Sequence, residues 1–231
     1  MEEAINLPLI DDRIGCRKLV AADKDDVEEM VTKYFVPNDI ISLAIGKVYS
    51  MEPMEEFLVE YTKQCVTNNA SLLAYNIQTG ESVGVILCHV LQLNDDNKSM
   101  DEAEWKEEFK EKGCTLIPGK LLSTLNEDLG KIIGSKLYLR VSISTVKPSY
   151  GRMGIMSGLR KRIELVAKDL GCEFIVSEST SLYTQRIASK LGYTTENEIK
   201  YSGYFDPLSG TYIFKHIPAP HQSVKLLVKS I

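Results

Sequence analysis

The segment of this chain best suited to chemistry is a glycine-containing turn at residues 148–154. It reads Pro-Ser-Tyr-Gly-Arg-Met-Gly and stands between an alternating run rich in β-formers and a run with helical periodicity. A strand that passes through such a turn into a helix aims unpaired backbone N–H groups at one point, where the helix dipole also favours anions. Arg152 adds a guanidinium that can bind phosphate. The pattern indicates a phosphate site, although a glycine turn that only feeds a packed helix has the same spacing.

The distribution of charge also indicates an anionic ligand near this turn. The chain carries 27 Lys plus Arg and 32 Asp plus Glu, for a net charge of -5. Residues 1–112 hold 11 basic and 23 acidic side chains, whereas residues 131–190 hold 11 basic and 4 acidic ones. A positive block around residues 148–154 attracts anions. The run Arg160-Lys161-Arg162 belongs to this block, and taken alone it is typical of a solvated helix face.

The composition excludes several classes of protein. With 231 residues, 44% of them hydrophobic and 26% charged, the chain is expected to form one globular domain over residues 1–231. No run of about 18 apolar residues predicts a membrane span. The acidic start Met1-Glu2-Glu3-Ala4 differs from a secretion signal, so we expect a cytoplasmic protein. Five scattered cysteines without a C-x-x-C pattern argue against disulfides and zinc, and we expect no metal.

Hydrophobic periodicity predicts alternating strands and helices. Strands are expected at 15–20, 71–77, 82–93, 136–146, 172–177, 193–201, 211–216 and 223–229, and helices over 52–67, 119–133, 155–170 and 182–190. The acidic segment 94–112 is interpreted as a solvated helix or an excursion from the domain. Strands with intervening helices favour an α/β layered domain around one mixed or mostly antiparallel sheet.

Four stretches, taken in order, resemble motifs of the GCN5-related N-acetyltransferases. Residues 146–155 resemble their motif A, which holds the pyrophosphate of acetyl-coenzyme A. Residues 184–193 resemble the second motif, a helix that ends in Leu-Gly before an aromatic residue. Residues 213–229 are similar to the ending of the insect arylalkylamine N-acetyltransferases. Residues 34–39 fit the position of their aromatic-aromatic-x-Pro-Asp-Glu-Pro segment, and together the matches span residues 15–230.

The resemblance implies a fold, a cosubstrate and an acceptor. The fold would be α/β (α+β), with a mixed, mostly antiparallel sheet of about seven strands flanked by helices on both faces. The ligands would be acetyl-coenzyme A and a small arylalkylamine of the dopamine, tyramine, octopamine or serotonin class, bound by a monomer or weak dimer. Nucleic acid is not expected, because neither a recognised motif nor stacking aromatics are visible. The residues assigned to acetyl-coenzyme A are Ser144, Thr145, Val146, Gly151, Arg152, Met153, Gly154, Ile155, Met156, Ser157 and Tyr183.

The same resemblance assigns catalytic residues. Asp39 stands at the position of the family's catalytic glutamate and is expected to take a proton from the amine. Thr180 and Thr184 stand at the family's hydroxyl pair, and Thr184 or Tyr183 would reprotonate the departing thiolate. A backbone N–H within residues 144–146 would polarise the acetyl carbonyl. Glu178 is an alternative carboxylate, and its other interpretation is an exposed acid at a strand end.

Departures from the family pattern leave rival interpretations open. Gly151 and Met156 stand where the family has Gln or Arg and a small residue, and Asp39 replaces a glutamate. These departures favour a rival hypothesis, a non-catalytic or weakly active protein that binds coenzyme A or an amine on the same fold. A third hypothesis is a protein or peptide acetyltransferase whose acidic half attracts basic peptides.

Two further residues are interpreted as structural. His221 stands beside prolines and is expected to hold a structural hydrogen bond. Cys172 stands at a strand start and is expected to be a small buried hydrophobe.

Overall fold

The computed structural model describes residues 5–6, 8–93 and 100–231. The acidic N-terminal residues 1–4, from which a secretion signal was excluded, lie outside the described residues. So does the first part of the acidic segment, residues 94–99. None of the helices in the described ranges combines the length and the apolar character that a membrane crossing requires.

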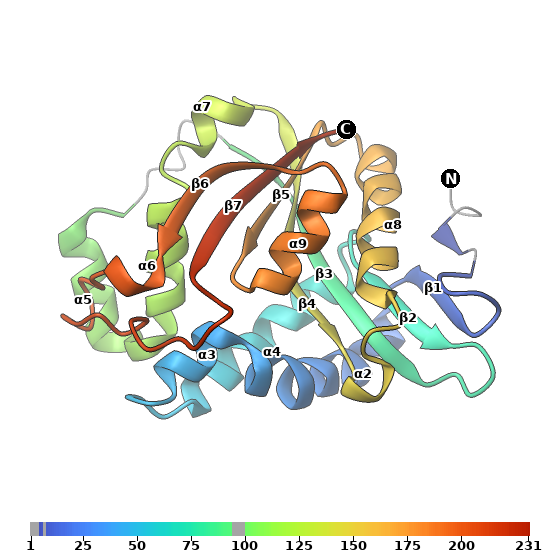
Figure 1. Cartoon of the computed structure of the whole chain (residues 1–231), viewed down its shortest axis with the longest axis horizontal. Helices are drawn as coiled ribbons and strands as arrows, with labels where there is room; N and C mark the ends of the chain where they lie inside the picture. Colours follow the sequence, from blue (N-terminus) through green and yellow to red (C-terminus); the bar gives the residue numbers. More distant parts are fainter. Residues whose placement is uncertain (1–4, 7, 94–99) are drawn as a thin grey trace.

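One seven-stranded sheet organises the chain, with the strand order β1-β2-β3-β4-β5-β7-β6 (Figure 1). Every neighbouring pair is antiparallel except β4 and β5, which are parallel. The prediction of a mixed, mostly antiparallel sheet is therefore confirmed. The strands are β1 (Ile14–Lys18), β2 (Leu72–Asn76), β3 (Ser82–Gln92), β4 (Leu137–Val146), β5 (Phe174–Ser179), β6 (Thr194–Lys200) and β7 (Ser223–Ser230).

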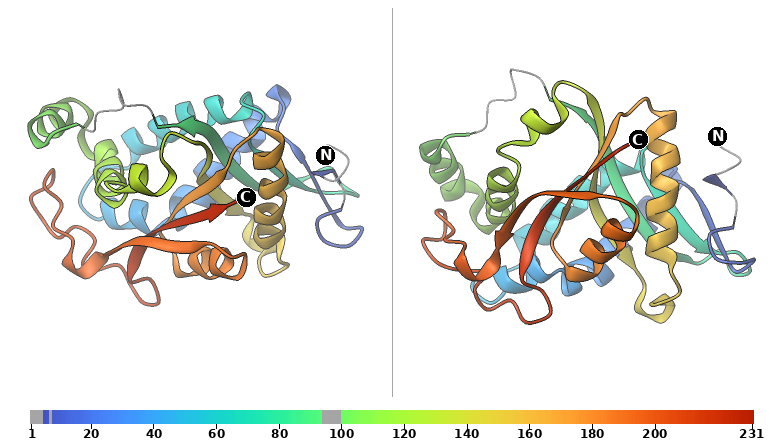
Figure 2. Two further views of the ribbon diagram at one scale, coloured as in Figure 1. Left: turned by 90° about the horizontal axis from the view of Figure 1, so that it is seen from above. Right: turned by 45° about the horizontal axis from the view of Figure 1, so that its top comes forward.

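Helices cover both faces of the sheet, as expected (Figures 1 and 2). One face carries α8 (Ile155–Asp169) and α9 (Leu182–Lys190). The other face carries α2 (Lys24–Glu29), a π-helical turn (Met30–Phe35), α3 (Ile40–Ile45), α4 (Glu52–Val66), α6 (Leu116–Leu125) and α7 (Leu129–Ile133). Helix α5 (Glu102–Lys112) lies beside α6 and accounts for the described part of the acidic segment.

Helix α8 follows the predicted apolar periodicity. Ile155, Leu159, Ile163 and Val166 recur at steps of four, four and three, and all are buried against the sheet. Burying each such side chain contributes about 1.5–3 kcal/mol relative to exposure. The helix begins after Gly154, whose φ of 86° suits a residue without a Cβ. This packing fixes the start of α8 at the carboxyl end of β4.

An irregularity in β4 opens the middle of the sheet. Leu87 pairs with Ile143 and Cys88 pairs with Val141, so Ser142 is an extra residue, a β-bulge. The parallel pairing of β4 with β5 covers only four residues and ends where Val141 pairs with Ser177. Beyond that pair the two strands share no ladder. The backbone of β4 past the bulge therefore borders a wedge-shaped opening instead of a neighbouring strand.

The predicted strand at 211–216 is wrong. Only a single bridge, from Asp206 to Thr211, forms there, and the following backbone is satisfied by turns such as Lys215 N to Tyr212 O at 2.9 Å. Ile213 and Phe214 of the run are buried against β7 and α6 without joining the sheet. The predicted helix 119–133 is also interrupted, because α6 ends at Leu125 and α7 begins at Leu129.

We expect Phe214→Ala to destabilise the fold although Phe214 lies outside any strand. Phe214 is fully buried, and its ring packs near Tyr201 and Tyr204. Its truncation should cost about 3–5 kcal/mol in the free energy of unfolding, measured by urea denaturation. Phe205→Ala is the control, because Phe205 is 50% exposed and should change little. Equal losses in the two variants would contradict the assignment of residues 211–216 to the core.

Candidate active site

A cavity of about 420 Å³ lies where β4 and β5 separate. It extends from the bulge in β4 to the helices on both sides of the sheet, since its lining includes residues of α3, α4, α6 and α8. Of the residues expected to act in catalysis or cosubstrate binding, the cavity brings together Asp39, Ser144, Thr145, Thr180 and Thr184.

The remaining predicted residues, apart from Tyr183 on α9, lie at the turn at the carboxyl end of β4 and in the start of α8. Arg152 and Gly154 have φ values of 63° and 86°, so the backbone twice adopts the left-handed region before α8 begins. No side chain caps the first turn of α8. Its initial N–H groups, together with the exposed Arg152, can therefore serve an anion. This arrangement fits the diphosphate of a coenzyme A thioester.

The hydrophobic residues in and beside the turn pack against the core and hold the turn on the sheet. Val146, Met153 and Met156 pack against the core between α8 and the sheet, and Ile155 is fully within that core. Gly151 lies in the turn itself, and Ser157 lies in the first turn of α8. None of these residues lines the cavity. Thr145 does, and it directly precedes Val146 in β4, so the turn begins beside the cavity.

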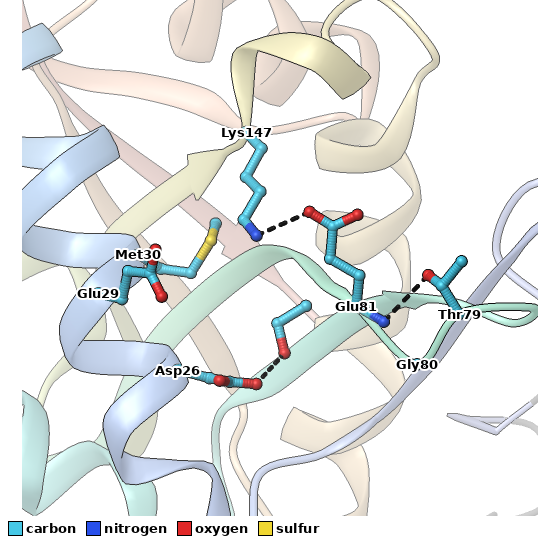
Figure 3. A pocket seen from close by; sticks show the side chains of 8 residues that line it. Asp26, Glu29, Met30, Thr79, Gly80, Glu81 and Lys147 are labelled. Atoms are coloured by element: carbon cyan, nitrogen blue, oxygen red, sulfur yellow. Dashed lines mark hydrogen bonds and ion pairs between the residues drawn. The ribbon is translucent and has the colours of Figure 1, made fainter.

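The turn is also tied to the β2–β3 hairpin. Lys147 Nζ lies 2.9 Å from a carboxylate oxygen of Glu81, and Tyr150 donates its hydroxyl to the other oxygen at 2.8 Å. Figure 3 shows Lys147 and Glu81 pointing toward each other, beside a small hollow that Asp26 and Glu29 also line. These contacts lower the pKa of Glu81, with the hydrogen bond from Lys147 as the largest cause. They hold the start of the turn in place.

Asp39 is positioned by the π-helical turn and by α3. Tyr34 and Phe35 end the π-helical turn and line the cavity, and Asp39 follows as the N-cap of α3. Its carboxylate accepts hydrogen bonds from Ser42 N at 2.9 Å and Ser42 Oγ at 3.0 Å, and from Thr180 Oγ1 at 3.4 Å. Burial raises the pKa of Asp39 above its ordinary value, and these hydrogen bonds lower it only in part. A carboxylate of raised basicity therefore faces the cavity.

The predicted hydroxyl groups separate into two environments. Thr180 and Thr184 line the cavity, and Thr184 Oγ1 donates to Ser181 O at 2.9 Å within the first turn of α9. Tyr183 is 59% exposed and its ring lies against His221 at a centroid distance of 5.3 Å. It does not line the cavity, so Thr184 is the better placed of the two candidate proton donors.

The interpretation of Glu178 as an exposed acid is wrong. Its side chain is 4% exposed and pairs with Arg140 at 2.9 Å. It also accepts a hydrogen bond from Asn126 Nδ2 at 2.8 Å. The coulombic attraction of Glu178 raises the pKa of Arg140. Glu178 therefore lines the cavity as one partner of an ion pair. The local sequence did not indicate this pair, because Arg140 lies on the neighbouring strand and is distant in sequence.

A tyrosine and a histidine extend this polar wall. Tyr61 of α4 lines the cavity, and its hydroxyl lies 3.0 Å from His89 Nδ1 on β3. Burial raises the pKa of Tyr61 to about 12, so the hydroxyl keeps its proton at neutral pH. Burial, with a contribution from Arg140, lowers the pKa of His89. Nothing in the sequence marked Tyr61 as a site residue, although its helical spacing with Leu58 placed it on the inner face of α4.

The interpretation of Arg160 as part of a solvated face is also wrong. Arg160 is 2% exposed and lines the cavity, whereas Lys161 is exposed. Burial lowers the pKa of Arg160. Arg160 shares a helical face with Ile163 and Ala167, both buried, and this three- and four-residue spacing was the available signal.

The two residues interpreted as structural lie as expected. His221 Nδ1 accepts a hydrogen bond from Leu182 N at 3.2 Å, which holds the start of α9. Cys172 is buried and free, and burial raises its pKa. In the part of the chain that the structure describes, no three His, Cys, Asp or Glu side chains are grouped to hold a metal ion.

The sequence matches no family model and no curated protein. Solved structures do match. One is arylalkylamine N-acetyltransferase 2 from Aedes aegypti, with a TM-score of 0.79 and 24% identity over 94% of this chain and 99% of that one. The chain has the fold of the GCN5-related N-acetyltransferases.

Two further structures with this acetyltransferase fold are similar over nearly their whole length. The mosquito arylalkylamine N-acetyltransferase like 5b has a TM-score of 0.75 and 23% identity, over 94% of this chain and 100% of that one. The polyamine N-acetyltransferase of Drosophila melanogaster has a TM-score of 0.71 and 19% identity, over 94% of this chain and 100% of that one. The fold implied by the sequence motifs is therefore confirmed.

The ion pair between Arg140 and Glu178 should be important for the stability of this acetyltransferase fold. Glu178→Ala removes a buried carboxylate from a guanidinium whose side chain is 32% exposed. We expect a loss of about 1–3 kcal/mol in the free energy of unfolding. Glu173→Ala is a matched control, because Glu173 is 54% exposed and pairs with Lys136 at the surface. It should cost about 0–1 kcal/mol. Urea denaturation of both variants measures the difference, and similar losses would refute the buried pair.

Proposed function

We propose that this chain transfers the acetyl group of acetyl-coenzyme A to the primary amine of a small arylalkylamine. The observation that carries the proposal is one cavity that joins the opening between β4 and β5 to a compartment containing the partly buried carboxylate of Asp39. One side of the cavity can receive a thioester from the glycine turn. The other side can receive an amine and accept its proton.

The amine compartment has the chemistry of an aromatic cation site. Its wall includes Tyr34, Phe35, Phe57 and Tyr61, with Leu58 between the last two. Aromatic faces attract ammonium groups and stack with aromatic rings. The acidic first half of the chain also favours the approach of cations. An arylalkylamine satisfies both features.

The cosubstrate is assigned to the turn and to β4. Acetyl-coenzyme A, when bound, supplies the acyl group as an activated thioester. The first N–H groups of α8 and the guanidinium of Arg152 would bind its diphosphate. The backbone of β4 beyond Ser142, which borders the opening, would donate N–H groups to the thioester carbonyl and stabilise the charge that develops on its oxygen.

Proton transfers are assigned to two residues of the cavity wall. An alkylamine is mostly protonated at neutral pH, so Asp39 would accept its proton, directly or through water. The raised pKa of Asp39 brings it closer to the operating pH, which favours general-base action. Thr184 would hold a proton at its hydroxyl for the sulfur that departs.

The comparisons support the class of the acceptor without fixing its identity. The mosquito protein is described as an arylalkylamine N-acetyltransferase and the Drosophila protein as a polyamine N-acetyltransferase. We favour an arylalkylamine because four aromatic side chains line the cavity, and two of them, Phe57 and Tyr61, stack at a centroid distance of 6.4 Å.

A thiol-release assay with acetyl-coenzyme A tests the proposal. The acceptor panel is dopamine, tyramine, octopamine and serotonin, with agmatine, spermidine and a lysine-rich peptide as comparisons. We expect turnover with the arylalkylamines and little with the peptide. Binding of coenzyme A without transfer to any acceptor would refute the enzyme and leave the non-catalytic binding protein.

Asp39→Asn should abolish most of the turnover while preserving the fold. We expect kcat to fall by about 100-fold or more, because the base is lost while the cap of α3 can persist. The wild-type rate should increase with pH through a pKa above the value of about 3.9 for a free aspartate, and the variant should lack this limb. Rates measured between about pH 5 and pH 8 test this; a limb retained in the variant would exclude Asp39 as the base.

The same variant has a stability signature. A raised carboxyl pKa in the folded state means that the unfolded chain ionises first as pH rises, so the wild type loses stability relative to Asp39→Asn. The melting temperature of the variant minus that of the wild type should therefore be larger at about pH 7.5 than at about pH 3.5. A difference of the opposite sign would show that the hydrogen bonds to Asp39 outweigh its burial.

Arg152→Ala should weaken binding of coenzyme A by about threefold to tenfold, because it removes a charged donor beside the first turn of α8. Isothermal titration calorimetry measures the affinity. Lys161→Ala is the matched control, since Lys161 is an exposed cation on the same helix. An equal effect in both variants would indicate only a general attraction of the positive surface, and no effect in Arg152→Ala would remove it from the site.

A further inference from the structure

Arg160 is a buried cation whose charge no described residue balances. Its Nη1 and Nη2 donate to Ser177 Oγ at 3.2 and 3.3 Å, and Ser177 is a neutral partner. Its remaining polar neighbour is the buried hydroxyl of Tyr193, which is also a neutral hydrogen-bonding group. Arg160 is nevertheless 2% exposed and forms part of the cavity wall.

The acidic residue that follows Arg160 on α8 and the acidic residue that follows Ser177 on β5 are already paired. Glu164 lies 2.6 Å from Lys229, and Glu178 pairs with Arg140. Glu178 also faces the opposite side of the sheet, because side chains alternate along β5 and Ser177 is its neighbour. A guanidinium removed from water without a counter-ion is unfavourable. An anion that enters the cavity would offset this cost.

The position of Arg160 indicates which part of a ligand would meet it. Ser177 belongs to the last pair between β5 and β4, so Arg160 stands at the closed end of the wedge between these strands. The glycine turn stands at the open end, beyond Val146. A thioester anchored by its diphosphate at the turn would extend along the wedge toward Arg160. Its acyl chain is the part that lies farthest from the diphosphate.

We propose that, besides acetyl-coenzyme A, the site accepts a coenzyme A thioester whose short acyl chain ends in a carboxylate, and that Arg160 binds this carboxylate. The proposal rests on the function proposed above and concerns the donor half of that site. A planar guanidinium binds a carboxylate through two parallel hydrogen bonds. The hydroxyls of Ser177 and Ser179, which line the cavity with Arg160, complete a polar end to the wedge.

The chemistry of transfer is unchanged by this carboxylate. The amine nitrogen forms a bond to the thioester carbonyl carbon, and the carbon–sulfur bond breaks with its electron pair going to sulfur. The proton lost by the amine balances the proton gained by coenzyme A. The distal carboxylate takes no part in the step and remains on the amide product.

Paired ligands of the same shape isolate the charge. Malonyl-coenzyme A is compared with isovaleryl-coenzyme A, in which two methyl groups replace the two carboxylate oxygens. Succinyl-coenzyme A is compared with isocaproyl-coenzyme A in the same way. Dissociation constants are measured by isothermal titration calorimetry without an amine, so this readout does not depend on turnover. We expect at least one carboxylate donor to bind about tenfold more tightly than its apolar counterpart.

Variants then assign the preference to Arg160. Arg160→Met should remove or reverse the preference, Arg160→Lys should retain part of it, and Lys161→Met should leave it unchanged because Lys161 is exposed. Circular dichroism checks that each variant folds. If Arg160→Met does not fold, the wild-type ratio and Arg160→Lys still decide the question. Equal affinities for both members of each pair in the wild type would overturn the proposal.

Transfer assays separate this inference from the proposed function. Turnover with acetyl-coenzyme A but no binding preference for the carboxylate donors would refute the role of Arg160 and retain the acetyltransferase. A binding preference without transfer from any donor to any amine would refute the acetyltransferase and retain the carboxylate site. We expect the preference to appear also in kcat/KM with a fixed amine acceptor.

Discussion

The short parallel pairing of β4 with β5 is the constraint on which the site depends. Two strands that pair over four residues and then separate leave backbone donors and acceptors with no ladder partner. The bulge at Ser142 reinforces this separation by shifting the register of β4 against β3. The sheet tolerates the opening because five other strand pairs and a helical layer on each face hold the two strands where they are. A ligand can then take the place of the missing strand.

Charges around the opening are arranged in three different ways. Arg140 and Glu178 neutralise each other and form a rigid wall, which costs little as long as both partners remain. Asp39 is held by neutral donors, so its basicity is raised rather than suppressed. Arg160 has no acidic partner among the described residues. One cavity of about 420 Å³ thus combines a neutralised ion pair, a carboxylate of raised basicity and a buried cation.

Local sequence patterns predicted the strand–turn–helix unit. They did not predict the burial of side chains whose contacts come from distant parts of the sequence. Residues 137–146 and 155–169 were recognised because alternation and helical periodicity are properties of neighbouring residues. The burial of Glu178 depends on Arg140, which is 38 residues away, and no local pattern reports it. Residues 211–216 have the composition of a strand. Their backbone forms turns instead, and it is from these turns that Ile213 and Phe214 enter the core. The turn and the aromatic segment before Asp39 indicated the candidate site from sequence, whereas the charge balance of its cavity required the fold.

The cysteines have a consequence for a reaction that releases a thiol. All five are buried, and burial raises the pKa of each sulfhydryl group, for Cys16 and Cys65 to about 12. Mixed-disulfide formation requires an accessible thiolate. Under the proposed function, coenzyme A released in the cavity would meet no accessible cysteine thiolate with which to form a mixed disulfide. Repeated turnover would then not depend on a reductant to keep these cysteines reduced.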